Sequence, residues 1–487
     1  MTHSLFLYDY ETTGTHPQKD RPLQFAGVRT DVDFNIIDDP ISLYCKVSLD
    51  ILPHPMACLL TGITPQRANE EGLCEADFMR RIHQALSTPG TCSLGYNSIR
   101  FDDEVTRHGL YRNFFDAYAR EWQHGNSRWD LLDVFRAAHA LRPQGINWVY
   151  DNDDVAVFKL DQLTAANGIA HANAHDALAD VYATLALAQR LKCAQPRLFN
   201  FFFEHRSKFQ ALKLLNVGAG TPLVHVSGMY PAAKHCLAVV LPLCVHPSNA
   251  NEVIVYDLSV EPSALLTLSA EDIKQRLFVP THALPENVSR IPLKTVHINK
   301  CPVLAPLSVL TPIDAQRLQL NLEVCQAHAK QILAAGNLTP TLHKVFANTL
   351  ERPDLPVNVD LSLYSGGFFS AVDQQAMIKI RNTPPEELAN LSFRYEDKRM
   401  SEMLFRYRAR NYPNTLTGVE WERWREFCFK QLTSATSDAS VTFTTYQQAL
   451  NDISPNNAAQ QAIKQALLDY AHDKCRQLDI DSHTFLI

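Results

Sequence analysis

The sequence predicts an α/β domain at residues 1–195, a β-rich domain at 196–350 and an α-helical domain at 364–487. Three observations support this order. Apolar strand-like runs mix with amphipathic stretches in the first part, strand-like runs dominate from about residue 220, and helical periodicity dominates after residue 363. With 487 residues, the chain is also too long for one ordinary core.

The elements of the first domain follow from its apolar patterns. Buried strands are expected at 4–10, 23–30, 41–47 and 92–96. Amphipathic or Ala/Leu-rich periodicity predicts helices at 75–86, 101–113, 129–141 and 175–192. Gln195-Pro196-Arg197 follows the last helix and marks the domain boundary, because Pro commonly follows a helix end.

The later domains are separated by a Pro- and Asp-rich linker at 351–363. Before it, LVHVSGMY (223–230), CLAVVLPLCV (236–245) and EVIVYDLSV (252–260) read as strands, with some helix after 313. After it, helices are expected at 384–411, 418–432 and 457–479, and 433–456 is expected to be an irregular insertion.

Composition predicts a folded cytoplasmic protein. Apolar residues make up 46% and charged residues 20%, which argues against disorder. The formal net charge of -7 does not advertise nucleic-acid binding, which then depends on local basic patches. The 11 cysteines include no CxxC pair, so neither a disulfide framework nor a zinc site is indicated. No apolar run reaches membrane-spanning length, and the N-terminus lacks a signal peptide pattern.

Two acids, Asp9 and Glu11, end the first strand in the run Asp-Tyr-Glu-Thr-Thr-Gly. Alternation along a strand places both carboxylates on one face. Adjacent carboxylates repel each other unless cations lie between them, and a pair of divalent ions would be held well there. The alternative is a solvent-facing strand end with two ordinary acids.

Two further patterns add acids and a histidine. Asp102 lies where a strand and loop lead into a helix, a position that also suits a helix cap. His175 and Asp180 stand five residues apart, so they would not share a helix face unless His175 lies at the helix entrance. The alternative for this pair is a surface histidine and a solvated aspartate.

Taken in order, these three patterns resemble the DEDDh exonuclease superfamily, whose fold is ribonuclease H-like. Longer matches extend the resemblance to the bacterial exonuclease I family over essentially the whole chain. They include GYNSIRFDDEVTR from residue 95, NGIAHANAHDALADVYAT from 167, VHINKCPVL from 296 and LFRYRARNYP from 404. The middle domain of that family is SH3-like and its C-terminal domain is helical.

The resemblance implies a 3′→5′ exonuclease that degrades single-stranded DNA to deoxynucleoside 5′-monophosphates, with a role in DNA repair. Asp9, Glu11, Asp102 and Asp180 would hold two Mg²⁺ ions, for which Mn²⁺ would substitute, because oxygen-rich sites favour these metals over zinc. His175 would act as the general base toward the attacking water.

The resemblance also implies substrate contacts. Besides Glu11, the positions expected to contact DNA are Arg107, Tyr118, Trp122, Arg136 and Lys159. Aromatic side chains stack bases and cations hold phosphates. A member of the family has Arg at the position of Lys159, and Lys cannot form the bidentate phosphate contact that Arg can. Residues 398–410 carry five basic side chains and one acid, and this contrast predicts a further DNA-facing surface.

A protein partner is implied as well. Exonuclease I proteins bind the acidic, apolar-tipped tail of single-stranded-DNA-binding protein, which requires a basic rim around an apolar pocket. The matching positions are Arg142, Arg197 and Phe201. The chain is expected to be a monomer without membrane attachment.

Two other functions remain open at this point. The first is an RNA-trimming DEDDh exonuclease, against which the long C-terminal part argues. The second is a non-catalytic single-strand-binding scaffold, which would be expected to have lost at least one of the five key residues. A mononucleotide-release assay on single-stranded DNA separates all three.

Overall fold

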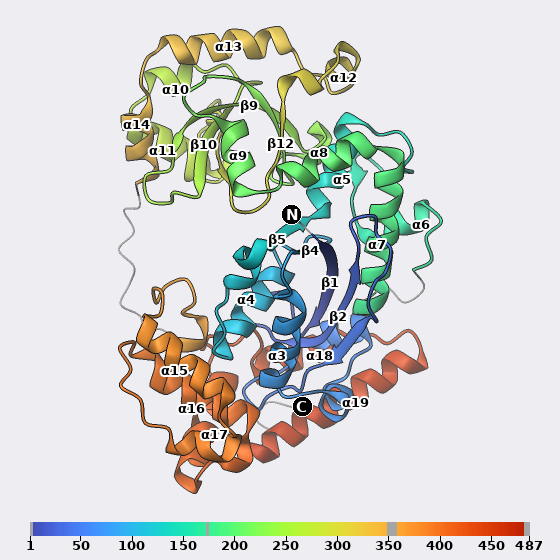
Figure 1. Cartoon of the computed structure of the whole chain (residues 1–487), viewed down its shortest axis with the longest axis vertical. Helices are drawn as coiled ribbons and strands as arrows, with labels where there is room; N and C mark the ends of the chain where they lie inside the picture. Colours follow the sequence, from blue (N-terminus) through green and yellow to red (C-terminus); the bar gives the residue numbers. More distant parts are fainter. Residues whose placement is uncertain (1–2, 172–174, 348–357, 482–487) are drawn as a thin grey trace. The chain divides into compact units, whose positions relative to one another are not determined.

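The computed structural model describes residues 3–171, 175–347 and 358–481 (Figure 1). It divides into two compact units. The first unit comprises Met1–Ser127, His171–Leu185 and Asp354–Ile487, and the second comprises Arg128–Ala170 and Ala186–Pro353. The expected linker at 351–363 lies largely outside the described residues. In the described part, no helix is both long and apolar enough to cross a membrane.

The central sheet has the strand order β3-β2-β1-β4-β5. Strand β1 pairs antiparallel with β2 and parallel with β4, with Asp9 opposite Ala26 and Leu7 opposite Leu94. This mixed sheet confirms the predicted α/β architecture. The strands are β1 (Ser4–Thr12), β2 (Pro22–Thr30), β3 (Ile41–Tyr44), β4 (Thr91–Gly95) and β5 (Ser127–Asp130).

Two helices cover one face of this sheet. Phe6, Tyr8 and Tyr10 of β1 pack against apolar residues of α3 (Glu75–Leu86) and α4 (Asp102–Arg112). Figure 1 shows these helices on one side of β1 and α7 on the other side. The remaining helices of this region are α1 (Pro55–Thr61), α2 (Pro65–Glu71) and α7 (Ala177–Ala194).

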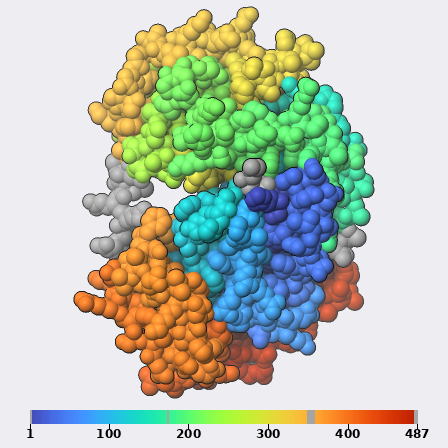
Figure 2. Space-filling view, viewed as in Figure 1, coloured from blue at the N-terminus to red at the C-terminus, as the bar shows by residue number. Residues whose placement is uncertain are grey.

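The C-terminal helices share a core with the N-terminal strands and loops of the first unit. Leu23 and Cys58 belong to the same buried cluster as Trp424, Tyr446 and Tyr470. Figure 2 shows the surface of this helical part in contact with that of the N-terminal part. The helices are α15 (Ala371–Asn382), α16 (Arg399–Asn411), α17 (Gly418–Thr433), α18 (Phe443–Asp452) and α19 (Ala458–Gln477).

The second unit contains the predicted β-rich part, a sheet with the order β11-β10-β9-β8-β12. All of its strand pairs are antiparallel. The strands are β8 (Leu223–Val226), β9 (Leu237–Val245), β10 (Glu252–Asp257), β11 (Leu293–His297) and β12 (Val303–Pro306). The unit also contains the hairpin β6 (Val149–Tyr150) and β7 (Ala156–Val157). Its helices are α5 (Leu131–Leu141), α6 (Leu160–Ala166), α8 (Pro196–His205), α9 (Lys208–Leu215), α10 (Ser263–Thr267), α11 (Ala270–Phe278), α12 (Pro312–Arg317), α13 (Leu322–Ala334) and α14 (Thr339–Phe346).

The prediction of a DNA-facing basic surface at 398–410 is wrong for Arg406, Arg408 and Arg410. Arg410 donates to Asp50 at 3.0 Å and to both oxygens of Asp360 at 2.6 and 2.8 Å, and all three side chains are buried. Arg406 also donates to Asp360, at 2.7 Å, and Arg408 pairs with a glutamate of α17. All of these acids lie outside α16, so counting charges along one helix missed them.

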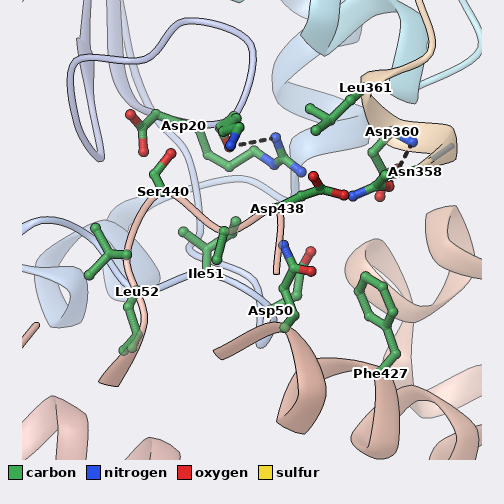
Figure 3. A pocket seen from close by; sticks show the side chains of 15 residues that line it. Asp20, Asp50, Ile51, Leu52, Asn358, Asp360, Leu361, Phe427, Asp438 and Ser440 are labelled. Carbon is green, nitrogen blue, oxygen red and sulfur yellow. Dashed lines mark hydrogen bonds between the residues drawn. The ribbon is translucent and has the colours of Figure 1, made fainter. Parts of the chain in front are cut away.

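A small cavity borders this ion-pair network. Asp50, Asp360 and Phe427 line it, and its volume of about 20 Å³ has room for roughly one water molecule (Figure 3). The cavity is also lined by residues of the segment expected to be irregular, 433–456. That expectation is wrong for residues 443–452, which form α18 behind a capping box of Thr442 and Thr445.

Candidate active site

Asp9 and Glu11 lie on the same face of β1, as their spacing predicts. The intervening Tyr10 and the preceding Tyr8 point into the core and are 4% and 2% exposed. The two acids are only half-buried and face away from α3 and α4. The period of two along a strand therefore separates the aromatic core from the acidic face.

Asp102 is joined to this strand by a hydrogen bond. The backbone N–H of Tyr10 donates to Oδ1 of Asp102 at 3.1 Å. Asp102 is the first residue of α4, and the capping position is taken by Phe101, whose side chain makes no capping bond. The alternative reading of Asp102 as a helix cap is therefore wrong.

Its neighbour Asp103 has a different role. Oδ1 of Asp103 accepts hydrogen bonds from the Tyr8 hydroxyl and from Nη2 of Arg120, both at 2.6 Å. The side chains of Asp103 and Arg120 are 2% and 0% exposed. Asp103 thus belongs to a buried structural ion pair, and Asp102 is the acid that lies beside the acidic strand.

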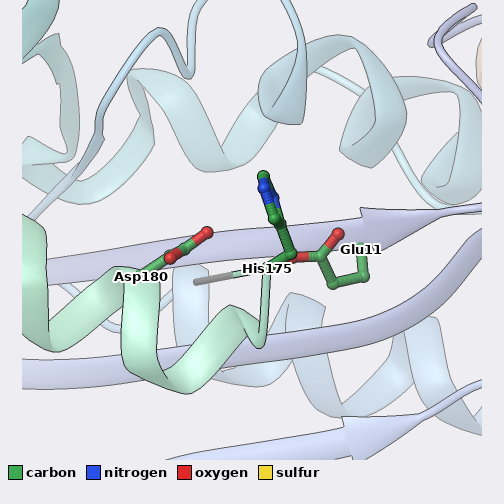
Figure 4. A group of neighbouring side chains, drawn as sticks. All are labelled: Glu11, His175 and Asp180. Atoms are coloured by element: carbon green, nitrogen blue, oxygen red, sulfur yellow. The ribbon is translucent and has the colours of Figure 1, made fainter. Parts of the chain in front are cut away.

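The third part of the site is the entrance to α7. His175 has a left-handed backbone, with φ of 70°, and the helix begins two residues later at Ala177. This turn brings the imidazole back toward Asp180 in the first turn. Ligand atoms of Glu11, His175 and Asp180 all lie within 4.8 Å of one another (Figure 4). The expected placement of His175 at the helix entrance is confirmed.

Gln24 of β2 fixes this helix entrance. Its Nε2 donates to Asp176 at 3.1 Å, and its Oε1 accepts from the N–H of Ala177 at 3.2 Å. Nε2 of His171 is hydrogen-bonded to Oδ1 of Asp180. Sequence reasoning missed Gln24 and His171, because their roles depend on contacts between distant elements that no local pattern encodes.

The acids of this cluster raise one another's pKa values. Burial, with the charges of Asp180, Asp102 and Asp176, raises the pKa of Glu11 to about 9. Burial and repulsion from Asp102 and Glu11 raise the pKa of Asp9 well above its usual range. Burial also raises the pKa of Asp180, although its hydrogen bond with His171 acts in the opposite direction. Such clustered carboxylates require positive charge between them when they are ionised.

The donor set fits hard divalent cations. It offers carboxylate oxygens from Asp9, Glu11, Asp102 and Asp180, with one imidazole beside them. Oxygen donors suit Mg²⁺ or Mn²⁺, and repulsion between the acids supplies a reason for cations to bind.

The predicted DNA contacts of the first unit differ in exposure. Arg107 is buried and forms a bidentate pair with Glu121 at 2.7 and 2.9 Å, and it also pairs with Glu104. Its guanidinium lies 5.4 Å from the ring of Tyr118, which is half-buried. Trp122 is 66% exposed and is open for base stacking. Arg107 can contact a phosphate only if these ion pairs rearrange.

The predicted DNA and partner contacts of the second unit lie on or next to its helices. Arg136 lies on α5 and pairs with Asp133 at 2.6 Å, whereas Lys159 precedes α6 and is exposed. Arg142 donates to Asp314 at 3.1 Å, Arg197 is exposed, and Phe201 stacks on His205 with ring centres 4.1 Å apart.

Comparison with known protein families gives matches to three successive parts of the chain. Residues 6–188 match the family Exonuclease, 206–348 match Exonuclease I SH3-like domain, and 357–474 match Exonuclease I C-terminal domain. Exodeoxyribonuclease I of Haemophilus influenzae is 45% identical over 96% of this chain and 98% of its own length. Exodeoxyribonuclease I of Escherichia coli K12 is 50% identical over 87% and 89%.

Solved structures extend these similarities to the fold. E. coli exonuclease I in complex with a dA16 oligonucleotide has a TM-score of 0.92 at 46% identity, covering 97% of this chain and 100% of that one. A zinc-ion-bound form of the E. coli exonuclease I complex with single-stranded DNA has a TM-score of 0.90 at 45% identity, with the same coverage.

Proposed function

Because this chain belongs to the exonuclease I family, we propose that it hydrolyses single-stranded DNA from the 3′ end and releases deoxynucleoside 5′-monophosphates. It is an exodeoxyribonuclease with a metal-dependent nuclease domain. The observation that carries the proposal is the convergence of Glu11, His175 and Asp180 within 4.8 Å, beside Asp9 and Asp102. Together these are the five residues that the chemistry requires.

In this mechanism, Asp9, Glu11, Asp102 and Asp180 hold two Mg²⁺ ions, and Mn²⁺ substitutes for them. Bound there, the ions supply charge neutralisation of the scissile phosphate and acidification of water. His175 accepts the proton of the attacking water, because an imidazole nitrogen within reach of that water can act as a general base. Its left-handed backbone holds the imidazole next to Asp180 and Glu11.

The proposed DNA contacts divide by chemistry. Tyr118 and Trp122 stack bases, and Arg136 and Lys159 contact phosphates. Arg107 contacts a phosphate when its ion pairs with Glu121 and Glu104 rearrange. Glu11 also contacts the terminal nucleotide. The exposed indole of Trp122 and the exposed ammonium of Lys159 support these two assignments most directly.

One assay tests the function and separates it from its alternatives. Single-stranded DNA labelled at either end, the matching duplex and an RNA of the same sequence are each incubated with protein and Mg²⁺. Release of 5′-mononucleotides from the 3′ end of the single-stranded DNA is expected. Faster release from RNA would indicate a ribonuclease, and binding without release would indicate a scaffold. Asp9→Asn is the control, with binding kept and turnover lost.

We also propose that the chain binds the acidic, apolar-tipped tail of single-stranded-DNA-binding protein through Arg142, Arg197 and Phe201. The exposed Arg197 and the half-buried ring of Phe201 are both on α8, and they supply a cation and an apolar surface. Titration of a fluorescent tail peptide at low salt tests this directly. Saturable binding that Arg197→Ala and Phe201→Ala weaken is expected, and linear uptake by the wild-type protein rejects the site.

The remaining organisation is proposed from the same family membership. The domain boundaries are 1–195 for the nuclease, 196–350 for the SH3-like domain, 351–363 for the linker and 364–487 for the helical domain. The protein acts as a monomer in the cytoplasm, in DNA repair. Sedimentation of the purified chain tests the monomeric state.

A further inference from the structure

Arg136, a proposed phosphate contact, is held on several sides within the second unit. Its Nη1 donates to Oδ1 of Asp133 at 2.6 Å, three residues earlier on α5. Its guanidinium carbon lies 5.8 Å from the ring centre of Phe158. Its Nε is buried and has no hydrogen-bond partner among the residues that the structure describes. The guanidinium therefore has a defined orientation before any ligand binds.

Gly228, in the loop between β8 and β9, lies directly against this guanidinium. A Cβ atom on Gly228 would lie 2.7 Å from both Cζ and Nη1 of Arg136 and 2.9 Å from its Nη2. All three of its nearest atoms would thus belong to one side chain. Gly228 has no left-handed backbone angle, so the position requires the absence of a side chain rather than the conformational freedom of glycine.

The loop and the arginine also share an acceptor. The backbone N–H of Gly228 donates to the same Oδ1 of Asp133, at 3.2 Å. Asp133 therefore ties the loop of the β-rich part to α5 and sets the distance between the loop and Arg136. A methyl group at position 228 would force apart the two groups that this carboxylate holds together.

We propose that Gly228 is a positioning residue for DNA binding: the absence of a side chain there lets the guanidinium of Arg136 lie against the β8–β9 loop in the position from which it contacts a phosphate. This inference rests on the proposed contact between Arg136 and DNA. A planar guanidinium binds phosphate through a fixed fork of N–H groups, so a shifted fork loses hydrogen bonds while it keeps its charge. The loop thereby makes the β-rich part a determinant of substrate affinity.

The test uses Gly228→Ala, Arg136→Ala and the double variant, with Gly218→Ala as the matched control. Gly218 has an ordinary backbone angle, and nothing lies within 4 Å of its Cβ position. KM and kcat on a single-stranded oligodeoxynucleotide are measured at several salt concentrations, together with the melting temperature. Gly228→Ala is expected to raise KM by about threefold to tenfold, the weight of roughly one ordinary hydrogen bond, with kcat within about twofold.

The double variant decides between positioning and packing. In the Arg136→Ala background the obstructing side chain is absent, so Gly228→Ala should add no further increase in KM. Arg136→Ala should also lower the salt dependence of binding by about one unit. An equal effect of Gly228→Ala on KM in both backgrounds, or no effect in either, overturns the positioning role. Equal losses in melting temperature in both backgrounds with KM unchanged also overturn it, because they indicate packing alone.

Two outcomes keep this inference separate from the proposed function. If Arg136→Ala itself leaves KM and the salt dependence unchanged, the DNA contact is wrong and the role of Gly228 falls with it. If Gly228→Ala does not fold, Asp133→Asn takes its place in the test. That substitution weakens the hydrogen bonds that hold Arg136 and the loop together, and it adds no volume. Asp133→Asn should raise KM in the wild-type background and leave it unchanged in the Arg136→Ala background, and additive effects would contradict the proposal.

Discussion

The backbone N–H of Tyr10 donates a hydrogen bond to Oδ1 of Asp102 across 3.1 Å. This contact joins the strand that carries two of the acids to the helix that carries a third. Replacement of Asp102 by Asn keeps an acceptor for Tyr10 and removes only the charge, so the melting temperature should stay close to the wild-type value. Turnover should fall by more than the roughly 10–100-fold that loss of an outer-shell metal partner costs.

Asp103→Asn is the matched control for that change. It removes the closer of two charge partners of the fully buried Arg120, the other being Glu121 at 3.8 Å, and should destabilise the fold by about 3–5 kcal/mol, as measured by chemical denaturation. If Asp103→Asn abolished turnover with the fold intact while Asp102→Asn remained active, the assignment of these neighbouring acids would be reversed.

His175 should be tested with Asn rather than with Ala alone. The left-handed φ of 70° at this position is one that Asn tolerates better than most residues, so His175→Asn removes the base with less backbone strain. Single-turnover cleavage is expected to slow by about 10²–10⁴-fold, with DNA affinity unchanged. Wild-type rates for His175→Asn would rule out the general-base role.

Metal binding should become stronger as pH rises. The pKa of Glu11 is raised to about 9 and that of Asp9 is raised too, so cations must displace protons from these acids below that pH. Without metal, an acid with a raised folded pKa binds more protons when folded than when unfolded. Stability of the metal-free protein therefore falls as pH rises from about 4 toward 9.

The measurement is a series of thermal melts with and without Mg²⁺ between pH 5 and 9. The stabilisation by Mg²⁺ is expected to grow across this range, and Glu11→Gln should flatten the trend. A stabilisation that is independent of pH would contradict the coupling between the acids and the cations.

The buried arginine network of α16 predicts a large effect on stability. Arg410→Met leaves Asp50 and Asp360 buried without their main partner and should cost about 3–5 kcal/mol in the free energy of unfolding. Arg425→Met, which breaks only surface ion pairs with Glu422 and Asp479, should cost far less. Urea denaturation of both variants gives the comparison, and equal costs would reject the network as a stabilising feature.

Local periodicity predicted the parts of the fold that depend on local physics. The strand carrying Asp9 and Glu11 and the helix at 75–86 follow from alternation and amphipathic spacing, and both are confirmed. Helix α18 was missed, although Phe443, Tyr446 and Leu450 have helical spacing, because its surroundings are rich in Ser and Thr. The polar composition of this segment led to the expectation of irregular structure, although three apolar residues have the spacing of a helix.

The site was predictable as a set of residues but not as a geometry. No sequence pattern states that Gln24 secures the helix entrance beside His175, or that His171 contacts Asp180. The arginines of α16 show the opposite error. Their basic character suggested DNA binding, but in the folded chain they form ion pairs with Asp50 and Asp360, which are distant in the sequence. Tertiary contacts decide whether a charge faces solvent or a partner.

The core shared by Leu23, Cys58, Trp424 and Tyr470 has a consequence for synthesis in the cell. A ribosome working at about 5–20 residues per second needs on the order of 20–90 s to proceed from the early strands to the last helix. During this interval the apolar surface that awaits the C-terminal helices remains available to chaperones. A message interrupted after the β-rich part would therefore release an aggregation-prone nascent chain rather than a smaller working enzyme.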